Sequence, residues 1–265
     1  MFGKLIKYEL RYLLRIFIPM WIAVLAMCGL ARVAAWNLVN TSEIVLTIVF
    51  LAVYMAFLAV FVVTEVVIVV RFYKGMYGDE GYLMFTLPVT NGQLLHSKAL
   101  SATLVSMGTM VVASLCGGIL LSYPEIREVF SLMLAEADVM FGFNGLQIAL
   151  LVFWIIVAAI VGAMSGVYAV YLAISIGQLW RKHPIIGAIL AYYGMSVLLS
   201  GILQAALLPT LMSEAVWLEA EWLMNLQPVT IIVGILVMIC VLNALMILIC
   251  SLITKLLMDK RLNIA

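Results

Sequence analysis

The sequence predicts an all-α integral membrane protein with six membrane-spanning helices. Hydrophobic residues make up 67% of its 265 residues and charged residues 10%. An ordinary soluble domain has about 45–50% apolar and about 25% charged residues. A chain of this size cannot hide so much apolar surface from water, so most of that surface must face lipid. The length of the apolar runs and the placement of charge between them support the same fold class.

Six apolar runs are each long enough to cross a bilayer, which takes roughly 20 helical residues. They are Ile16–Trp36, Ile44–Val70, Ala99–Ser122, Leu146–Ile176, Ile185–Leu208 and Thr230–Leu256. None shows the alternation of a transmembrane β-strand, so helices are the structure that satisfies their backbone hydrogen bonds in lipid. Several runs are longer than the bilayer requires, and we expect them to tilt or to project beyond it.

The charged residues predict which ends of the spans face the cytoplasm. One alternating set of segments holds twelve of the fourteen basic residues: Lys4, Lys7, Arg11, Arg15, Arg71, Lys74, Lys98, Arg181, Lys182, Lys255, Lys260 and Arg261. The other set holds Arg32 and Arg127 and collects eight acidic residues: Glu43, Glu125, Glu128, Glu136, Asp138, Glu214, Glu219 and Glu221. Because basic segments stay inside, both termini are predicted to be cytoplasmic.

The N-terminal residues 1–15 are predicted to form a helix that lies in the cytoplasmic interface. The four basic residues Lys4, Lys7, Arg11 and Arg15 recur at three- and four-residue steps and therefore share one helical face. Such a face suits anionic headgroups. A plain positive flank of the first span is the alternative. A cleaved secretion signal is disfavoured, because the apolar run is longer than a usual signal core.

The segment Arg71–Lys98 is the longest inside loop, and it predicts a short helix of its own. Three glycines interrupt the pattern of the second span: Gly75, Gly78 and Gly81. Asp79 and Glu80 suit the first turn of a helix, and Pro88 would end it. Its apolar residues are Tyr82, Leu83, Met84 and Phe85. On a solvent-facing loop such residues are expected to pack against another surface. The stretch Thr90–Gln93 matches a capping box that would start the third span's helix.

Two outside segments have a mixed character. Pro124–Asn144 is acidic and contains an amphipathic stretch, and Pro209–Pro228 combines Trp217 and Trp222 with three glutamates. The second segment suits the outer interface or the mouth of a cavity. A solvated loop is the alternative.

No pattern in the sequence indicates catalysis or metal binding. His96 and His183 lie in separate inside loops without a carboxylate or cysteine at ligand spacing. The chain has no phosphate-binding loop and no metalloprotease or serine-hydrolase motif. The four cysteines, Cys28, Cys116, Cys240 and Cys250, all lie in apolar runs, where we expect them to pack as small residues. A membrane protease or a complete ATPase is therefore not supported.

Three polar residues inside the spans are candidate functional residues, namely Glu65, Gln204 and Asn243. Glu65 lies about a turn and a half before Arg71, and would either bind a proton, a cation or a cationic substrate, or pair with Arg71 or another basic residue. We prefer the pairing. Gln204 and Asn243 are expected to form hydrogen bonds between helices. Close helix packing is expected at Gly162 and Gly166, a GxxxG pair, and at the adjacent Gly117 and Gly118.

Two stretches carry a family resemblance. Gly3-Lys4-Leu5-Ile6-Lys7-Tyr8-Glu9-Leu10 and the loop from Arg71 to Lys98 resemble the permease subunits of bacterial ABC transporters, of the six-span, type-two export class. The rest of the chain is similar in topology and composition alone. The resemblance implies an N-terminal interfacial elbow helix and a coupling helix between the second and third spans. The coupling segment would be Gly78–Leu87. The residues that would contact a separate ATPase subunit are Gly78, Asp79, Glu80, Gly81, Tyr82, Leu83, Phe85 and Pro88.

The resemblance also implies partners and a location. The chain would be a single transmembrane domain, 1–265, in the bacterial cytoplasmic membrane, paired with a second permease chain that is identical or related. It would be no enzyme and hold no cofactor, since ATP and Mg would bind the partner ATPase. It would bind no nucleic acid and export an unidentified substrate, and Pro209–Pro228 would occupy the place of a re-entrant segment. The alternatives are an ATP-independent channel or proton-coupled transporter that uses Glu65, and a membrane scaffold or sensor that transports nothing.

Overall fold

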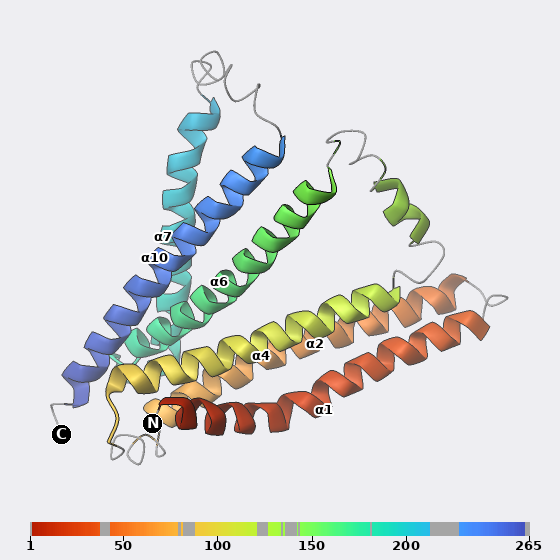
Figure 1. The fold of residues 1–265 in the computed structure, drawn as a ribbon. Coiled ribbons are helices and arrows are strands. Elements are labelled where there is room, and N and C mark those ends of the chain that lie inside the picture. Colours follow the sequence, from red (N-terminus) through yellow and green to blue (C-terminus); the bar gives the residue numbers. More distant parts are fainter. Residues whose placement is uncertain are drawn as a thin grey trace. The chain divides into compact units, whose positions relative to one another are not determined.

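The computed structural model describes residues 2–37, 43–78, 81, 88–120, 127–133, 135, 142, 144–180, 182–212 and 228–262. Within these ranges the chain is helical and contains no strand. Figure 1 shows the six long helices, which are α1 (Phe2–Asn37), α2 (Glu43–Met76), α4 (Asn91–Leu120), α6 (Gly145–Gly177), α7 (Pro184–Met212) and α10 (Pro228–Leu262). The all-α fold class is as predicted.

The long helices have the length and apolarity of membrane-spanning segments. Helices α1, α2, α4, α6 and α10 each contain a stretch that is long and apolar enough to cross a bilayer, and α7 contains a shorter apolar stretch, Pro184–Leu198. Large apolar side chains point outward from these helices, among them Leu30, Met55 and Leu146. Such a surface is typical of helices that face lipid. The structure is therefore that of a helical protein compatible with embedding in a membrane.

The chain forms two compact units, Met1–Met140 and Phe141–Ala265. In the first unit, α1, α2 and α4 pack against one another, with α1 and α4 running in one direction and α2 in the other (Figure 1). In the second unit, α6 packs against both α7 and α10. Whether the two units make up the single transmembrane domain expected from the sequence stays a prediction.

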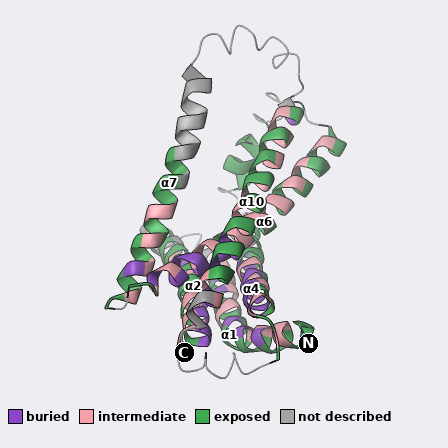
Figure 2. Ribbon diagram, turned by 90° about the vertical axis from the view of Figure 1, so that its left-hand side faces the viewer, coloured by how far each residue is buried: buried purple, intermediate pink, exposed green. Residues whose placement is uncertain are grey.

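The core of the first unit is built from one face of each helix. On α2 the buried positions follow four-residue steps through Thr64, Ile68, Phe72 and Met76, so this stripe faces the core. Small side chains of all three helices form one cluster: Val24, Cys28, Ala31, Val53, Val60, Val112 and Cys116. Buried residues lie on α1, α2 and α4 in the first unit and on the second half of α6 in the second unit, whereas the described positions of α7 are mostly exposed or half-buried (Figure 2).

The cysteines are packing residues, as predicted. All four are free thiols, and Cys28, Cys116 and Cys250 are buried. Cys28 of α1 and Cys116 of α4 lie in the same buried cluster of the core. A thiol is small and weakly polar, so the pair fits an apolar contact between two helices.

A buried polar network joins the same three helices farther along the unit. The indole Nε1 of Trp21 donates a hydrogen bond to the Thr109 hydroxyl at 3.1 Å, and the hydroxyls of Thr109 and Thr64 lie 3.4 Å apart. Gly108 leaves space for the indole, because a Cβ at that position would collide with the Trp21 ring. The network therefore holds α1 and α2 against α4. A side chain at position 108 would push α1 away from α4.

The predicted interfacial helix and the first span form one continuous helix, α1. Pro19 lies inside it, and Figure 1 shows α1 changing direction within its first half. Proline removes one helical hydrogen bond and crowds the preceding turn, which is a common cause of such a bend. The basic residues Lys4, Lys7, Arg11 and Arg15 are exposed on one side of α1, while Glu9, Leu13 and Phe17 are buried on the other.

The second unit shows one expected contact and corrects another. Ser165 of α6 donates a hydrogen bond to the side-chain oxygen of Asn243 in α10, which is the interhelical role expected of Asn243. Among the described residues, none packs closely on the GxxxG pair, because a Cβ at Gly162 or Gly166 would meet nothing within 4 Å. The same correction applies to Gly117 and Gly118 of α4. These glycines lie on faces of their helices that no neighbouring helix contacts closely.

Close backbone contact occurs instead where α6 turns into α7. A Cβ on Gly177 would collide with the backbone nitrogen of Ala188 and lie 2.6 Å from the Pro184 carbonyl oxygen. The turn is closed by the amide of Trp180, which donates to the Gly177 carbonyl at 3.1 Å. At this turn, glycine is required because two helix ends touch through their main chains.

We predict that Gly108→Ala destabilises the protein by about 1–3 kcal/mol, the usual penalty of overpacking. The rigid indole of Trp21 cannot move away without losing its hydrogen bond to Thr109. Gly117→Ala is the matched control, since it lies in α4 and meets nothing within 4 Å. It gains the same helix propensity, about 1 kcal/mol. Thermal unfolding in detergent measures both, and equal melting temperatures would contradict the contact.

Candidate functional site

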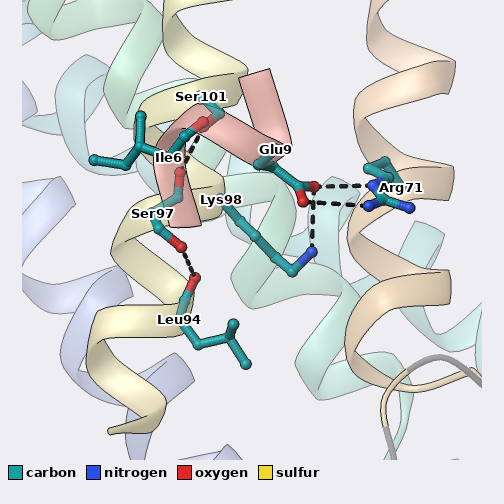
Figure 3. Close-up of polar contacts among 7 residues, drawn as sticks. All are labelled: Ile6, Glu9, Arg71, Leu94, Ser97, Lys98 and Ser101. Carbon is teal, nitrogen blue, oxygen red and sulfur yellow. Dashed lines mark hydrogen bonds and ion pairs between the residues drawn. The ribbon is translucent and has the colours of Figure 1, made fainter. Parts of the chain in front are cut away.

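Three charged residues from three helices meet in the first unit (Figure 3). Glu9 lies near the start of α1, Arg71 near the end of α2 and Lys98 near the start of α4. The Arg71 Nε donates to Glu9 Oε1 at 2.9 Å and its Nη2 donates to Oε2 at 3.2 Å. The Lys98 Nζ donates to the same Oε1 at 3.2 Å. One carboxylate therefore binds two cations, and we call these three residues the Glu9 cluster.

The Glu9 cluster is shielded from solvent. The side chains of Lys98, Glu9 and Arg71 are 3%, 9% and 16% exposed. Charges at such depth are screened little by salt and interact more strongly than exposed pairs. Removing one partner of a buried pair leaves a charge that neither water nor protein compensates. The Glu9 carboxylate is thus the group that makes two buried cations tolerable at this place.

Neighbouring residues fix how each cation is held. The Arg71 guanidinium lies over the ring of Tyr12, 4.0 Å from its centroid, so α1 binds Arg71 through both Glu9 and Tyr12. The Lys98 ammonium lies against Gly75 of α2, where a Cβ would be 2.7 Å from Nζ. Gly75 thus leaves the space through which Lys98 reaches the carboxylate. Helices α1 and α2 each contribute about one turn to the contact.

Hydroxyl groups of α4 continue the contact beside the Glu9 cluster. Ser101 donates to the Ser97 carbonyl at 2.9 Å and lies 3.5 Å from the Ile6 carbonyl of α1. Ser97 in turn donates to the Leu94 carbonyl at 2.9 Å (Figure 3). Because these hydroxyls bond to main-chain carbonyls, α4 can place small polar side chains against α1 without an unsatisfied group.

The chain folds back tightly where α2 ends. The amides of Tyr77 and Gly78 donate to the Tyr73 carbonyl at 2.8 and 3.0 Å, and that of Gly81 donates to the Gly78 carbonyl at 2.9 Å. A Cβ on Gly81 would lie 2.8 Å from the Met76 carbonyl oxygen. Of the glycines predicted to interrupt the second span, Gly78 and Gly81 form a compact turn against its last residues, whereas α2 continues through Gly75.

The other end of this loop starts α4 as the sequence predicts. Pro88 and Thr90 are exposed, and the amide of Gln93 donates to the Thr90 side chain at 3.3 Å. This bond is the N-terminal half of the expected capping box. Asp79, Glu80 and residues 82–87, including Tyr82, Leu83 and Phe85, lie outside the described residues. The predicted coupling helix thus stays a prediction.

Glu65 is placed differently from what we preferred. The sequence favoured a pair with Arg71 or with another basic residue, but Arg71 binds Glu9, and Glu65 is exposed on α2. Among the described residues no hydrogen bond or ion pair of Glu65 is present. The neighbours of Glu65 on that face are apolar, including Phe61 and Val62. The side chain of Gln204 lies outside the described residues.

The Glu9 cluster was missed by the sequence analysis, although one signal was available. Glu9 is the first acidic residue of the chain, and the next is Glu43. It stands at the head of a four-residue repeat with Leu13 and Phe17, both buried apolar residues. A carboxylate on the apolar face of a basic helix needs a cation from elsewhere, and this argument would have identified Glu9 as a paired residue.

Comparison with protein-family models, with curated proteins and with solved structures gives no match for this chain. In the part of the chain that the structure describes, no group of three His, Cys, Asp or Glu side chains could hold a metal ion.

We predict that Glu9→Gln costs about 3–5 kcal/mol of stability, the usual effect of breaking a buried ion pair. The amide keeps the size of the side chain but leaves two cations facing each other. Lys98→Met costs less, because Arg71 and Glu9 keep their pair. Thermal unfolding in detergent ranks the two variants, and the reverse order would show that Glu9 does not hold the cations together.

Proposed function

We propose that this chain is the membrane-spanning permease subunit of an ATP-driven exporter of the ABC class. In this proposal it lies in the bacterial cytoplasmic membrane with both termini inside, forms half of the translocation path beside a second permease chain, and hydrolyses no ATP. A separate ATPase subunit would bind the segment between α2 and α4. Closure of two such subunits around ATP would move this segment and tilt the helices.

The observation that carries the proposal is the way the loop between α2 and α4 is mounted. Its sequence resembles the coupling loop of those permeases, and it leaves α2 through the Gly78–Gly81 turn. It ends at Thr90, whose side chain caps the start of α4. The Glu9 cluster ties both flanking helices to α1 close to this loop. A loop that receives force from another protein needs such a fixed base, whereas a mere connection between spans does not.

The direction of the helices supports the topology in this proposal. Glu9, Arg71 and Lys98 come from three segments that the distribution of charge assigns to the inside. They meet at one end of the first unit, as the alternation of spans requires. The elbow role of the N-terminal part of α1 rests on its exposed basic face and on the bend near Pro19.

We predict that the chain co-purifies with an ATPase that carries a phosphate-binding loop. Changing Tyr82 and Phe85 together to Glu should abolish this association, because charges would replace the apolar residues expected to enter the partner. Affinity purification from native membranes followed by mass spectrometry measures it. Phe130→Glu is the control, since Phe130 is 43% exposed and belongs to an outside segment. Undiminished ATPase in the double variant would refute the coupling assignment.

Glu65 favours a second candidate function, transport driven by an ion gradient without ATP. A carboxylate exposed among apolar side chains of a membrane helix is costly unless it meets a proton, a cation or another chain. We predict that, if this candidate holds, proteoliposomes conduct protons along an imposed pH gradient and Glu65→Gln removes this flux. A pH-sensitive dye inside the vesicles measures it, with Glu128→Gln as the control. Equal flux in both variants excludes the candidate.

A further inference from the structure

We infer that Glu9 is the positioning residue that makes the N-terminal part of α1 follow the movement of the loop between α2 and α4. This inference rests on the proposed function, since it concerns how force from an ATPase subunit passes through this chain. Figure 3 shows the Glu9 carboxylate between Arg71 and Lys98. The three side chains come from the N-terminal helix and from the two helices that enter and leave the loop.

Glu9 joins α1 to both flanking helices at once. Its Oε1 accepts bonds from Arg71 and from Lys98, at 2.9 and 3.2 Å. Losing either cation would leave α1 tied to the other helix. Losing the carboxylate would remove both of these ion pairs at once. Glu9 is therefore the residue of the cluster on which the whole attachment depends.

The attachment fixes the orientation of α1 as well as its distance from the neighbouring helices. Arg71 binds Glu9 through two parallel bonds, a geometry that a guanidinium and a carboxylate adopt in one plane. The Tyr12 ring covers the guanidinium one helical turn farther along α1. Gly75, one turn after Arg71, receives the Lys98 ammonium. Contacts over about one turn of α1 and of α2 hinder rolling of α1 on α2.

The path along the chain from the loop to the Glu9 cluster is short. Arg71 lies five residues before the last residue of α2, and Lys98 lies seven residues after the first residue of α4. At 1.5 Å per residue these helical paths are about 8 and about 10 Å long. Helical turns of this length are stiff, so a displacement of the loop reaches both cations. The shared carboxylate then passes it to α1.

The test measures whether α1 and α2 move together. The complex with its ATPase is reconstituted in nanodiscs, with native cysteines replaced by Ala, and spin labels are placed in two separate pairs. One pair joins Tyr8 of α1 to Leu252 of α10, and the other joins Lys74 of α2 to Leu252; all three sites are exposed. Electron–electron distances are recorded without nucleotide and after trapping with ATP and vanadate.

In the wild-type complex we expect ATP to shift both distances. In Glu9→Gln complexes that still bind the ATPase, the Lys74 pair should shift and the shift of the Tyr8 pair should be lost. A merely structural role of Glu9 would not separate the two pairs. The exchange Glu9→Lys with Lys98→Glu restores one anion between two cations, and it should restore the shift of the Tyr8 pair.

Three results would overturn the inference. The first is a Tyr8 pair that shifts in Glu9→Gln as it does in the wild type. The second is a wild-type complex that binds its ATPase but shows no shift in the Tyr8 pair. The third is an exchanged variant that folds with ATPase bound but does not regain the shift of the Tyr8 pair. Absence of any ATPase from the wild-type preparation would instead contradict the proposed function. The two failures are thereby distinguished.

Discussion

A buried carboxylate that two cations share is the interaction on which the arrangement of the first unit depends. Arg71 and Lys98 are too deeply placed to be hydrated fully, since their side chains are 16% and 3% exposed. Without an anion between them, α2 and α4 could not approach at this level. Glu9 supplies that anion from α1, so the position of the N-terminal helix follows from the need to compensate charge. Tyr12 and Gly75 then adjust the contact to the shape of each cation.

Apolar surface cannot supply this specificity in a protein whose surroundings are also apolar. In lipid, helices associate through close packing and hydrogen bonds, because burying an apolar side chain gains little over leaving it in contact with acyl chains. The first unit meets this requirement at two levels, through the Glu9 cluster and through the network of Trp21, Thr109 and Thr64. The second unit uses Ser165 and Asn243. Apolar residues fill the space between these polar contacts.

The fold class was predictable because hydropathy and length act within each segment. The helix that contains the predicted span 146–176 begins and ends within a residue of it, at Gly145 and Gly177. The start of α4 followed from Thr90, whose side chain accepts a bond from the Gln93 amide three residues later. Each of these features is decided by neighbouring residues, so one sequence contains all that is needed to predict it.

Contacts between distant residues could not be predicted in the same way. Arg71 binds Glu9 across 62 residues, and the nearer Glu65 was preferred because proximity along one helix is visible in the sequence. The GxxxG pair shows the same limit: small residues permit close approach but do not produce it, and Gly162 and Gly166 face open space. Gly108 and Gly75 do lie at close contacts, although neither belongs to such a motif. Which glycine is needed depends on the helix that arrives opposite it.

The two cations of the Glu9 cluster have different tasks, and the difference explains their residue types. A guanidinium offers two parallel donors and a flat face, so Arg71 can bind both carboxylate oxygens and lie against Tyr12 at the same time. These contacts set the angle of α1. An ammonium on a long stem can reach through a narrow gap, and Lys98 does so beside Gly75. Its bond to Oε1 sets how closely α4 approaches. Exchanging the two residue types would keep the charge but would lose this fit, because lysine lacks two parallel donors and a guanidinium is bulkier than the ammonium that lies against Gly75.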